Sequence, residues 1–147
     1  MANQIGNTGI WIGGRKYAFD EHSVYNTSHL ISHVLNVASD VKTSFDCGLN
    51  DKYIYGRCNL HDFDDLRPIL NDAFQFIENA LNDNHHVLVH CRMGINRSCA
   101  VVLAYLVLRN KLSIESGLLL IQNSRPRANP GKWFLDQIES CLHQTFV

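Results

Sequence analysis

The chain has 147 residues, of which 46% are apolar and 18% are charged, and its formal net charge at pH 7 is −1. This composition excludes a disordered protein and leaves no overall positive charge that would attract nucleic acid or an anionic membrane surface. The longest uninterrupted apolar run, Cys99 to Leu108, has ten residues and is too short to cross a bilayer. The first residues also lack a basic segment followed by an apolar one. We therefore expect one domain over residues 1–147, without a membrane partner, in the cytoplasm, with the nucleus as an additional compartment.

Three strands are predicted in the first half of the chain. The segment from Gln4 to Ile12 has strand-like apolar residues and ends at the Gly13-Gly14 turn. Residues 31–38 alternate between apolar and polar side chains, and residues 51–59 contain two tyrosines and an isoleucine, which favour strands. These segments would supply one part of a sheet.

The next predicted element is a helix. From Leu66 to Leu81 the apolar residues recur with a helical period. Pro68 then falls in the first turn, where a helix tolerates proline, and Asp65 is well placed to cap the N-terminus. The polar cluster at 82–84 predicts where this helix ends.

The second half of the chain is predicted to hold one strand and three helices. Residues His86 to His90 form a short apolar strand, and a helix from about Arg97 to Asn110 is apolar on nearly every side, which places it inside the molecule. Ser113 is expected to cap a helix that ends near Ser124, and residues 131–144 form the last helix. This order of elements predicts an α/β fold with a sheet covered on both faces.

The most informative segment lies between the predicted strand and the predicted buried helix, and it reads His90-Cys91-Arg92-Met93-Gly94-Ile95-Asn96-Arg97-Ser98. A short loop that leads into a helix turns successive main-chain N–H groups toward one point, which creates a site for an anion. Gly94 permits backbone angles that a side chain would disfavour, and Arg97 can bind a phosphate through two donors. The same N–H groups and the helix dipole favour the thiolate form of Cys91, which is then a nucleophile toward a bound phosphoryl group. Ser98 can donate a hydrogen bond to the sulfur when it later departs.

This segment resembles the His-Cys-x5-Arg-Ser/Thr signature of the cysteine-dependent protein tyrosine phosphatases, in particular their small atypical, viral-like dual-specificity branch. The resemblance extends over nearly the whole chain, through the segments Ile31–Ala38, Phe76–Glu78, Val87–Val89, Leu103–Leu106, Ser124–Pro126 and Asn129–Leu135. It implies a central mixed, mostly parallel sheet of about five strands with helices on both faces. It also implies hydrolysis of phosphate esters through a phosphocysteine, without a metal or another cofactor.

The resemblance further implies a general acid on a loop about thirty residues before the cysteine, and three aspartates are candidates. Asp65 has the capping role described above, and Asp64 either shares that role or is solvated. Asp62 lies free on the loop, 91 − 62 = 29 residues before Cys91. Asp62 is therefore the expected acid, with Asp64 as the alternative.

Other residues around the signature have expected supporting roles. His90 is expected to hold the loop through a hydrogen bond rather than to act in catalysis. By resemblance Asn129 bridges to the loop; otherwise it begins the last helix. The phosphate is expected to bind to the residues of the loop, namely Arg92, Met93, Gly94, Ile95, Asn96 and Arg97.

Three features have two interpretations each. Cys58 is either a partner of Cys91 under oxidation or, preferably, an ordinary thiol at a strand end. The run of Arg125, Arg127 and Lys132 forms either a cationic rim of the site or a solvated turn. Residues 145–147 match a carboxyl-terminal PDZ ligand, but three residues are too few to predict such a partner.

These observations favour an enzyme that removes phosphate from phosphotyrosine and from phosphoserine or phosphothreonine, with phosphorylated proteins as its partners. The alternative is the same catalytic loop acting on an RNA 5′-triphosphate or a phosphoinositide. Against it, the chain lacks a basic track lined by aromatic residues for RNA, and it lacks the two loop lysines often found in relatives that act on inositides. A non-catalytic phosphoprotein-binding module is disfavoured because Cys91, Arg97 and a nearby aspartate are all present.

Overall fold

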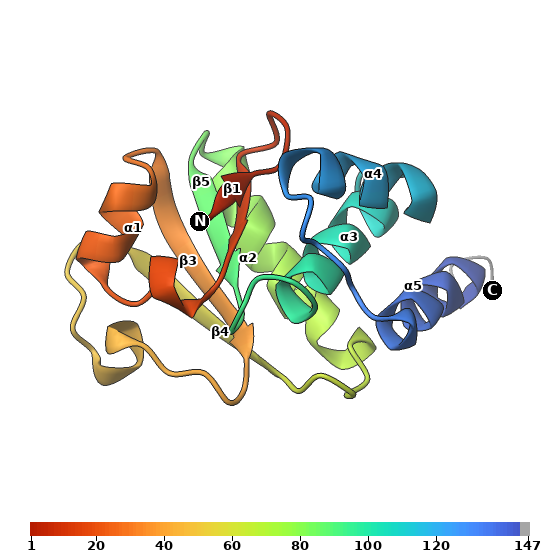
Figure 1. Ribbon diagram of the computed structural model, residues 1–147, viewed down its shortest axis with the longest axis horizontal. Coiled ribbons are helices and arrows are strands. Elements are labelled where there is room, and N and C mark those ends of the chain that lie inside the picture. Colours follow the sequence, from red (N-terminus) through yellow and green to blue (C-terminus); the bar gives the residue numbers. More distant parts are fainter. Residues whose placement is uncertain (145–147) are drawn as a thin grey trace.

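The structure is a computed structural model that describes residues 1–144, so the tripeptide 145–147, considered above as a PDZ ligand, lies outside the described residues. The five strands form one sheet in the order β1-β2-β5-β3-β4 (Figure 1). Strand β1 is antiparallel to β2, and the other neighbours are parallel. The expected mixed, mostly parallel sheet is confirmed. The strand bounds are β1 (Asn3–Gln4), β2 (Ile10–Gly13), β3 (Ile31–Ala38), β4 (Ile54–Leu60) and β5 (His86–His90).

Helices lie on both sides of the sheet (Figure 1). Their bounds are α1 (Glu21–Thr27), α2 (Leu70–Asn82), α3 (Arg97–Leu108), α4 (Ile114–Ser124) and α5 (Lys132–Gln144). Successive residues of β3 belong to two different cores. Leu35 packs into the larger core with the layer formed by α2 to α5, whereas Val34 packs with Val24 of α1 in a smaller core. This division follows from the pleat of a strand, in which neighbouring side chains point to opposite faces.

Helix α3 is the centre of the larger layer. Every residue from Arg97 to Val107 is buried, as the apolar sequence on all sides of this helix predicts. Helices α2, α4 and α5 pack around it. Within residues 1–144, no helix is both long and apolar enough to span a membrane.

The single strand predicted from Gln4 to Ile12 is wrong, because the chain turns back on itself within this segment. Gly6 and Gly9 have φ angles of 53° and 81°, in the left-handed region that glycine adopts without strain. The turn separates β1 from β2, which pair as a short antiparallel ladder.

The start of the helix predicted from Leu66 also differs. Helix α2 begins at Leu70, after a 3-10 turn over Arg67–Ile69 that contains Pro68, and no side chain caps either element. Asp65 is therefore not a helix cap. Its carboxylate instead accepts hydrogen bonds from the main-chain N–H and the guanidinium of Arg67.

Helix α1 is not predicted from the sequence. The sequence feature that could have predicted this helix is its N-cap residue, Asp20. The Asp20 carboxylate accepts hydrogen bonds from the N–H and the hydroxyl of Ser23 at 2.8 and 2.7 Å. Ser113 caps α4 as expected, by accepting from the Ser116 N–H. The remaining predicted elements begin and end within a few residues of their expected bounds.

The parallel strands all end at one edge of the sheet. The register pairs Gly13 and Asn36 with His90, and Ala38 with Leu60. The loops that follow β2, β3, β4 and β5 therefore meet at this edge, where ligands usually bind in open α/β sheets.

Candidate active site

The segment from Cys91 to Asn96 forms the loop between β5 and α3. At its centre Gly94 has a φ angle of 69°, which glycine adopts without strain. A Cβ atom at this position would lie 2.6 Å from Nη2 of Arg125 and 2.7 Å from the carbonyl carbon of Gly13. The loop therefore requires glycine here both for its backbone angle and for its packing.

Arg125, directly after α4, holds this loop from behind. Its side chain is buried and donates hydrogen bonds from Nε to the Gly94 carbonyl at 2.7 Å and from Nη2 to the Met93 carbonyl at 3.1 Å. Neither interpretation of the cationic run applies to Arg125, because it is a buried support of the loop. Lys132 of the same run is exposed and pairs with Asp136 on α5.

Cys91 lies at the floor of the loop, with its side chain buried. Its Sγ accepts a hydrogen bond from the Gly94 N–H at 3.3 Å and lies 3.2 Å from the hydroxyl oxygen of Ser98. The Gly94 N–H donates to the sulfur, and the Ser98 hydroxyl is close enough to donate to a thiolate. The loop thus brings together the residues that the sequence singles out as a nucleophile and its hydrogen-bond partner.

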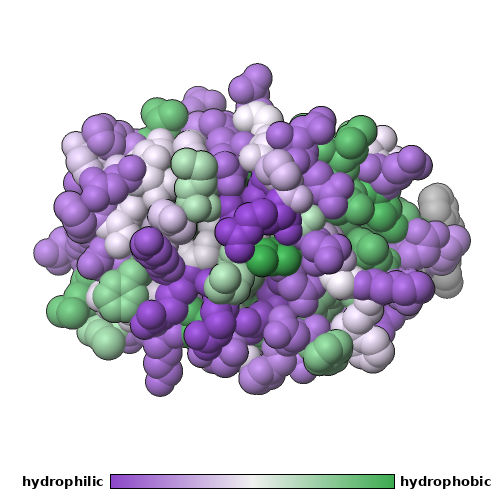
Figure 2. Space-filling model, viewed as in Figure 1, coloured by the Kyte–Doolittle hydropathy of each residue, from purple (hydrophilic) through white to green (hydrophobic). Residues whose placement is uncertain are grey.

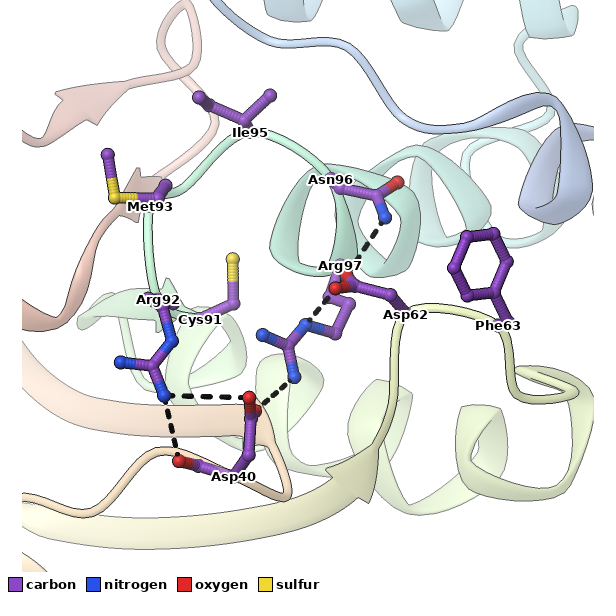
Figure 3. A pocket seen from close by; sticks show the side chains of 9 residues that line it. All are labelled: Asp40, Asp62, Phe63, Cys91, Arg92, Met93, Ile95, Asn96 and Arg97. Atoms are coloured by element: carbon purple, nitrogen blue, oxygen red, sulfur yellow. Dashed lines mark hydrogen bonds and ion pairs between the residues drawn. The ribbon is translucent and has the colours of Figure 1, made fainter.

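A cavity of about 380 Å³ opens above Cys91. In Figure 2 a small apolar patch surrounded by hydrophilic side chains lies over this loop. Three loops at the carboxyl edge of the sheet supply the walls (Figure 3). The lining residues are Asp40 after β3, Asp62 and Phe63 after β4, and Arg92, Met93, Ile95, Asn96 and Arg97 around Cys91.

The guanidinium of Arg97 forms one wall of the cavity, and its side chain is only 5% exposed. Nη1 binds Oδ1 of Asp40 at 2.5 Å and donates to the Leu60 carbonyl at 3.1 Å, while Nε lies 3.2 Å from Oδ1 of Asp62. Figure 3 shows the third guanidinium nitrogen pointing toward Cys91. Arg97 is therefore placed between the cysteine and two carboxylates.

Of the three aspartates considered as a general acid, Asp62 is the one that lines the cavity. Its side chain is 54% exposed and accepts a hydrogen bond from Nδ2 of Asn96 at 3.1 Å. The Asp64 carboxylate turns away and accepts from the His61 N–H at 2.8 Å, and Asp65 binds Arg67.

His90 is buried beneath the loop. Its Nδ1–H donates a hydrogen bond to the Cys91 carbonyl at 3.2 Å, so the expected contact with the loop is present. Burial lowers the pKa of His90 to about 4, which leaves the imidazole neutral near pH 7.

The segment before α5 is also attached to the loop. The main-chain N–H of Asn129 donates to the Ile95 carbonyl at 2.8 Å, and α5 begins three residues later, at Lys132. This contact is made through the main chain, so a bridging role of the Asn129 side chain stays a prediction. Oδ1 of Asn96 accepts from the Gly131 N–H at 2.7 Å. Asn96 therefore connects this segment with Asp62 through one side chain.

Sequence reasoning missed the positions of Asp40 and Arg125 in the site. Asp40 lines the cavity, and its hydrogen bond with Arg97 holds the pKa of this carboxyl below its usual value. The position of Asp40 directly after β3 could have indicated this, because loops that follow neighbouring parallel strands meet at one edge of the sheet. Arg125 belongs to a segment that carries the resemblance and to the cationic run with Arg127 and Lys132, but neither pattern indicates a buried side chain.

The arrangement of the strands disfavours a bond between Cys58 and Cys91. Strand β3 lies between β4, which carries Cys58, and β5, so the two cysteines are two strand spacings apart, roughly 10 Å. A disulfide requires Cα atoms within about 7 Å. Burial also raises the pKa of Cys58 to about 11, which keeps this thiol protonated and unreactive.

Residues 13–143 match the family model of the dual specificity phosphatase catalytic domain. A probable dual specificity protein phosphatase of Dictyostelium discoideum is 28% identical over 146 residues, which cover 93% of this chain and 63% of the relative. Protein phosphatase Slingshot homolog 3 of Homo sapiens is 35% identical over 111 residues, which cover 74% of this chain and 16% of the relative. The chain thus spans less than two thirds of the length of either relative.

Solved structures show the same arrangement of elements. The crystal structure of human DUSP28 matches this chain with a TM-score of 0.83 and covers 99% of this chain and 95% of that chain, at 21% identity. At this level of identity the match establishes a common fold.

Proposed function

The chain belongs to the dual specificity phosphatase family, and from this membership we propose that it hydrolyses phosphate monoesters on proteins, at phosphotyrosine and at phosphoserine or phosphothreonine. The proposal takes residues 1–147 as one catalytic domain and phosphorylated proteins as its partners. One observation carries it. Sγ of Cys91 lies at the floor of a cavity, where it accepts a hydrogen bond from the Gly94 N–H, lies within hydrogen-bond distance of the Ser98 hydroxyl and is beside the Arg97 guanidinium.

In the first step the Cys91 thiolate attacks the phosphorus of the bound ester. The sulfur–phosphorus bond forms as the bond between phosphorus and the ester oxygen breaks, and Asp62 donates its proton to that oxygen. Arg97 and the main-chain N–H groups of residues 92–97 bind the other phosphoryl oxygens and stabilise the charge of the transition state. The dephosphorylated side chain then leaves.

In the second step water hydrolyses the phosphocysteine. The Asp62 carboxylate accepts a proton from the water as its oxygen attacks phosphorus, and the sulfur–phosphorus bond breaks. The Ser98 hydroxyl donates a hydrogen bond to the departing sulfur, which returns as a thiolate. Inorganic phosphate leaves the cavity.

Asp62 is the proposed acid because its carboxylate faces the cavity, whereas the Asp64 carboxylate is engaged by the His61 N–H. Without substrate, Asp62 pairs with Nε of Arg97. A phosphate bound to Arg97 would replace this carboxylate at Nε and leave it near the ester oxygen.

The first test compares the turnover of a phosphopeptide by Cys91→Ser and by Cys47→Ser, which changes an exposed thiol outside the cavity. We expect kcat to fall by about 10⁴-fold or more for Cys91→Ser, because the nucleophile is lost, and to stay unchanged for Cys47→Ser. Retained turnover by Cys91→Ser would refute the proposal.

The second test concerns the substrate. Phosphate release is measured for a phosphotyrosine peptide, a phosphothreonine peptide, a triphosphorylated RNA and a phosphoinositide at equal concentrations. We expect both peptides to be hydrolysed faster than the RNA and the lipid. A preference for RNA or lipid would replace proteins as the substrate class.

A further inference from the structure

The two edges of the Arg97 guanidinium have different kinds of partner. The Nη1 edge is engaged by Asp40 and by the main-chain carbonyl of Leu60. The other edge, formed by Nε and Nη2, faces the cavity, where Nε meets the half-exposed Asp62 carboxylate and Nη2 points toward Cys91 (Figure 3).

A phosphate that binds an arginine with two parallel hydrogen bonds needs two neighbouring N–H donors in one plane. The edge formed by Nε and Nη2 meets this requirement once Asp62 moves aside. The Nη1 edge does not, because Asp40 and Leu60 occupy it. The direction in which Arg97 presents its donors therefore depends on what holds Nη1.

Asp40 is held in place although its side chain is 48% exposed. It lies in the loop 38–41, whose carbonyl groups converge on the guanidinium of Arg57. Nη2 of Arg57 donates to the carbonyls of Ala38 and Ser39 at 3.0 and 2.9 Å, and Nη1 donates to that of Val41 at 2.9 Å. One arginine thus fixes the main chain on both sides of Asp40.

Arg57 is itself fixed by Asp46, whose Oδ1 lies 3.0 Å from Nη1 of Arg57 and accepts the Tyr55 hydroxyl at 2.6 Å. These side chains are well covered, at 22% exposure for Arg57 and 15% for Asp46. The contacts form a continuous connection from Tyr55 on β4, through Arg57 and the loop 38–41, to Asp40 in the cavity.

We propose that Asp40 is a positioning residue for phosphate binding: it holds the Nη1 edge of Arg97 so that the edge formed by Nε and Nη2 faces the substrate, and Arg57 fixes the loop that presents it. Asp40 also accepts hydrogen bonds from Nη2 of Arg92 at the mouth of the cavity, at its main-chain carbonyl (3.0 Å) and at its carboxylate (3.5 Å). The predicted effect of Asp40 on turnover rests on the proposed function. The predicted effect of Asp40 on anion affinity is independent of that function.

The charge of Asp40 and its positioning role predict opposite effects on anion binding. A carboxylate in the cavity repels a phosphate dianion, so its removal would by charge alone tighten binding. If Asp40 orients Arg97, its removal weakens binding despite the gain in positive charge. The sign of the change therefore separates the two roles.

The experiment measures the affinity of tungstate by calorimetry, in a Cys91→Ser background that carries Asp40→Ala, Asp40→Asn or the control Asp136→Ala. Asp136 forms an exposed ion pair on α5, outside the cavity. We expect Asp40→Ala to raise the Kd for tungstate about tenfold. This is the effect of losing one good hydrogen bond between a misoriented Arg97 and the anion. Asp40→Asn keeps an oxygen for Nη1 and should restore the Kd to within about threefold of the parent. Tighter binding by Asp40→Ala, or a Kd equal to that of Asp136→Ala, would overturn the inference.

Turnover of an aryl phosphate by the same substitutions with Cys91 intact supplies the second readout. We expect kcat/KM to fall about 30-fold for Asp40→Ala and about tenfold for Arg57→Gln, with recovery in Asp40→Asn, because Arg97 binds the oxygens of both substrate and transition state. Equal losses for Asp40→Ala and Asp40→Asn would contradict positioning through Nη1. If the parent enzyme shows no turnover, the proposed function fails, while the tungstate affinities still decide the role of Asp40.

Discussion

The loop that carries Cys91 and the loop that carries Asp62 face the same cavity, but they are held in different ways. The first lies between a buried strand and a buried helix, and the buried Arg125 binds two of its carbonyls. The second is open to solvent, with Asp62 54% and Phe63 80% exposed. It is attached to α5 mainly through the Asp64 carbonyl, which accepts from Nε1 of Trp133 at 2.8 Å and from Nε2 of Gln137 at 3.1 Å.

This difference separates two requirements of the proposed reaction. Binding and attack require donors that are already in position when the phosphate arrives, and a rigid loop supplies them without reorganisation. Proton transfer requires a carboxylate that can leave Arg97 and reach the ester oxygen, which an exposed loop permits. Changes in the Cys91 loop should therefore lower both stability and turnover, whereas changes at Asp62 should lower turnover alone.

The largest effect is expected for Gly94→Ala. The added Cβ would meet the main chain of Gly13 and force a left-handed backbone on alanine, so the free energy of unfolding should fall by about 3 kcal/mol and kcat/KM by about 10²–10³-fold. Urea unfolding and steady-state assays measure the two quantities. Gly48→Ala is the matched control, because Gly48 also has a positive φ, of 76°, but its Cβ would meet no atom within 4 Å. Equal losses for the two variants would mean that the Cys91 loop is not specially constrained.

The second effect concerns pH and His90. The pKa of His90 is about 4 in the folded protein and about 6.5 in the unfolded chain, so between these values the unfolded state binds the extra proton. Stability should therefore be lost as the pH falls from 7 to 4, and His90 should account for about 3 kcal/mol of this loss. Unfolding by urea across this range should show a shallower pH dependence for His90→Gln than for the parent protein. Identical curves for His90→Gln and the parent would contradict a neutral buried imidazole.

The third effect tests the open loop. Asp62→Asn should lower kcat about 10²-fold, because the proton donor is lost, and should change the free energy of unfolding by less than about 0.5 kcal/mol, because the side chain is exposed. Asp64→Ala is the control and should show the reverse pattern, because it removes the oxygen that accepts from the His61 N–H: a loss of about 1 kcal/mol in stability and little change in kcat. If Asp64→Ala shows the larger loss of turnover, the acid is Asp64.

The smallest effect is expected where the two loops meet. Asn96→Ala removes the contacts of one side chain with Asp62 and with the Gly131 N–H. We expect kcat to fall about fivefold, since both catalytic groups remain and only their relative placement loosens. Steady-state kinetics at several pH values measures this loss. An unchanged kcat would show that the two loops act independently.

The parts of the fold that could be predicted are those that a pattern within one short segment of the sequence determines. Strand β3 follows from its alternation of apolar and polar residues, and strand β5 and helix α3 follow from nearly continuous apolar segments. The loop between β5 and α3 follows from its signature and from Gly94. Helix α1 was missed because it has seven residues and buries one of them, Val24, so it has little periodic pattern.

The parts that could not be predicted depend on contacts between distant segments. Asp40 belongs to the site because the ends of β3, β4 and β5 converge, and Arg125 belongs to it because a turn after α4 passes behind the loop. Asp40 has no local pattern that differs from an ordinary surface turn, and the cationic run that includes Arg125 does not indicate burial. The expected cap at Asp65 fails because a 3-10 turn over Arg67–Ile69 separates this residue from the start of α2 at Leu70.

The hydrogen bond between Trp133 and the Asp64 carbonyl makes the loop that carries Asp62 observable by spectroscopy. The chain has two tryptophans, and the other, Trp11, lies in β2 with its indole bonded to His86. In a Trp11→Phe background, the intrinsic fluorescence therefore comes from an indole that is 51% exposed and attached directly to this loop. Its emission in a single turnover would report whether the contact between this loop and α5 persists, without any added label.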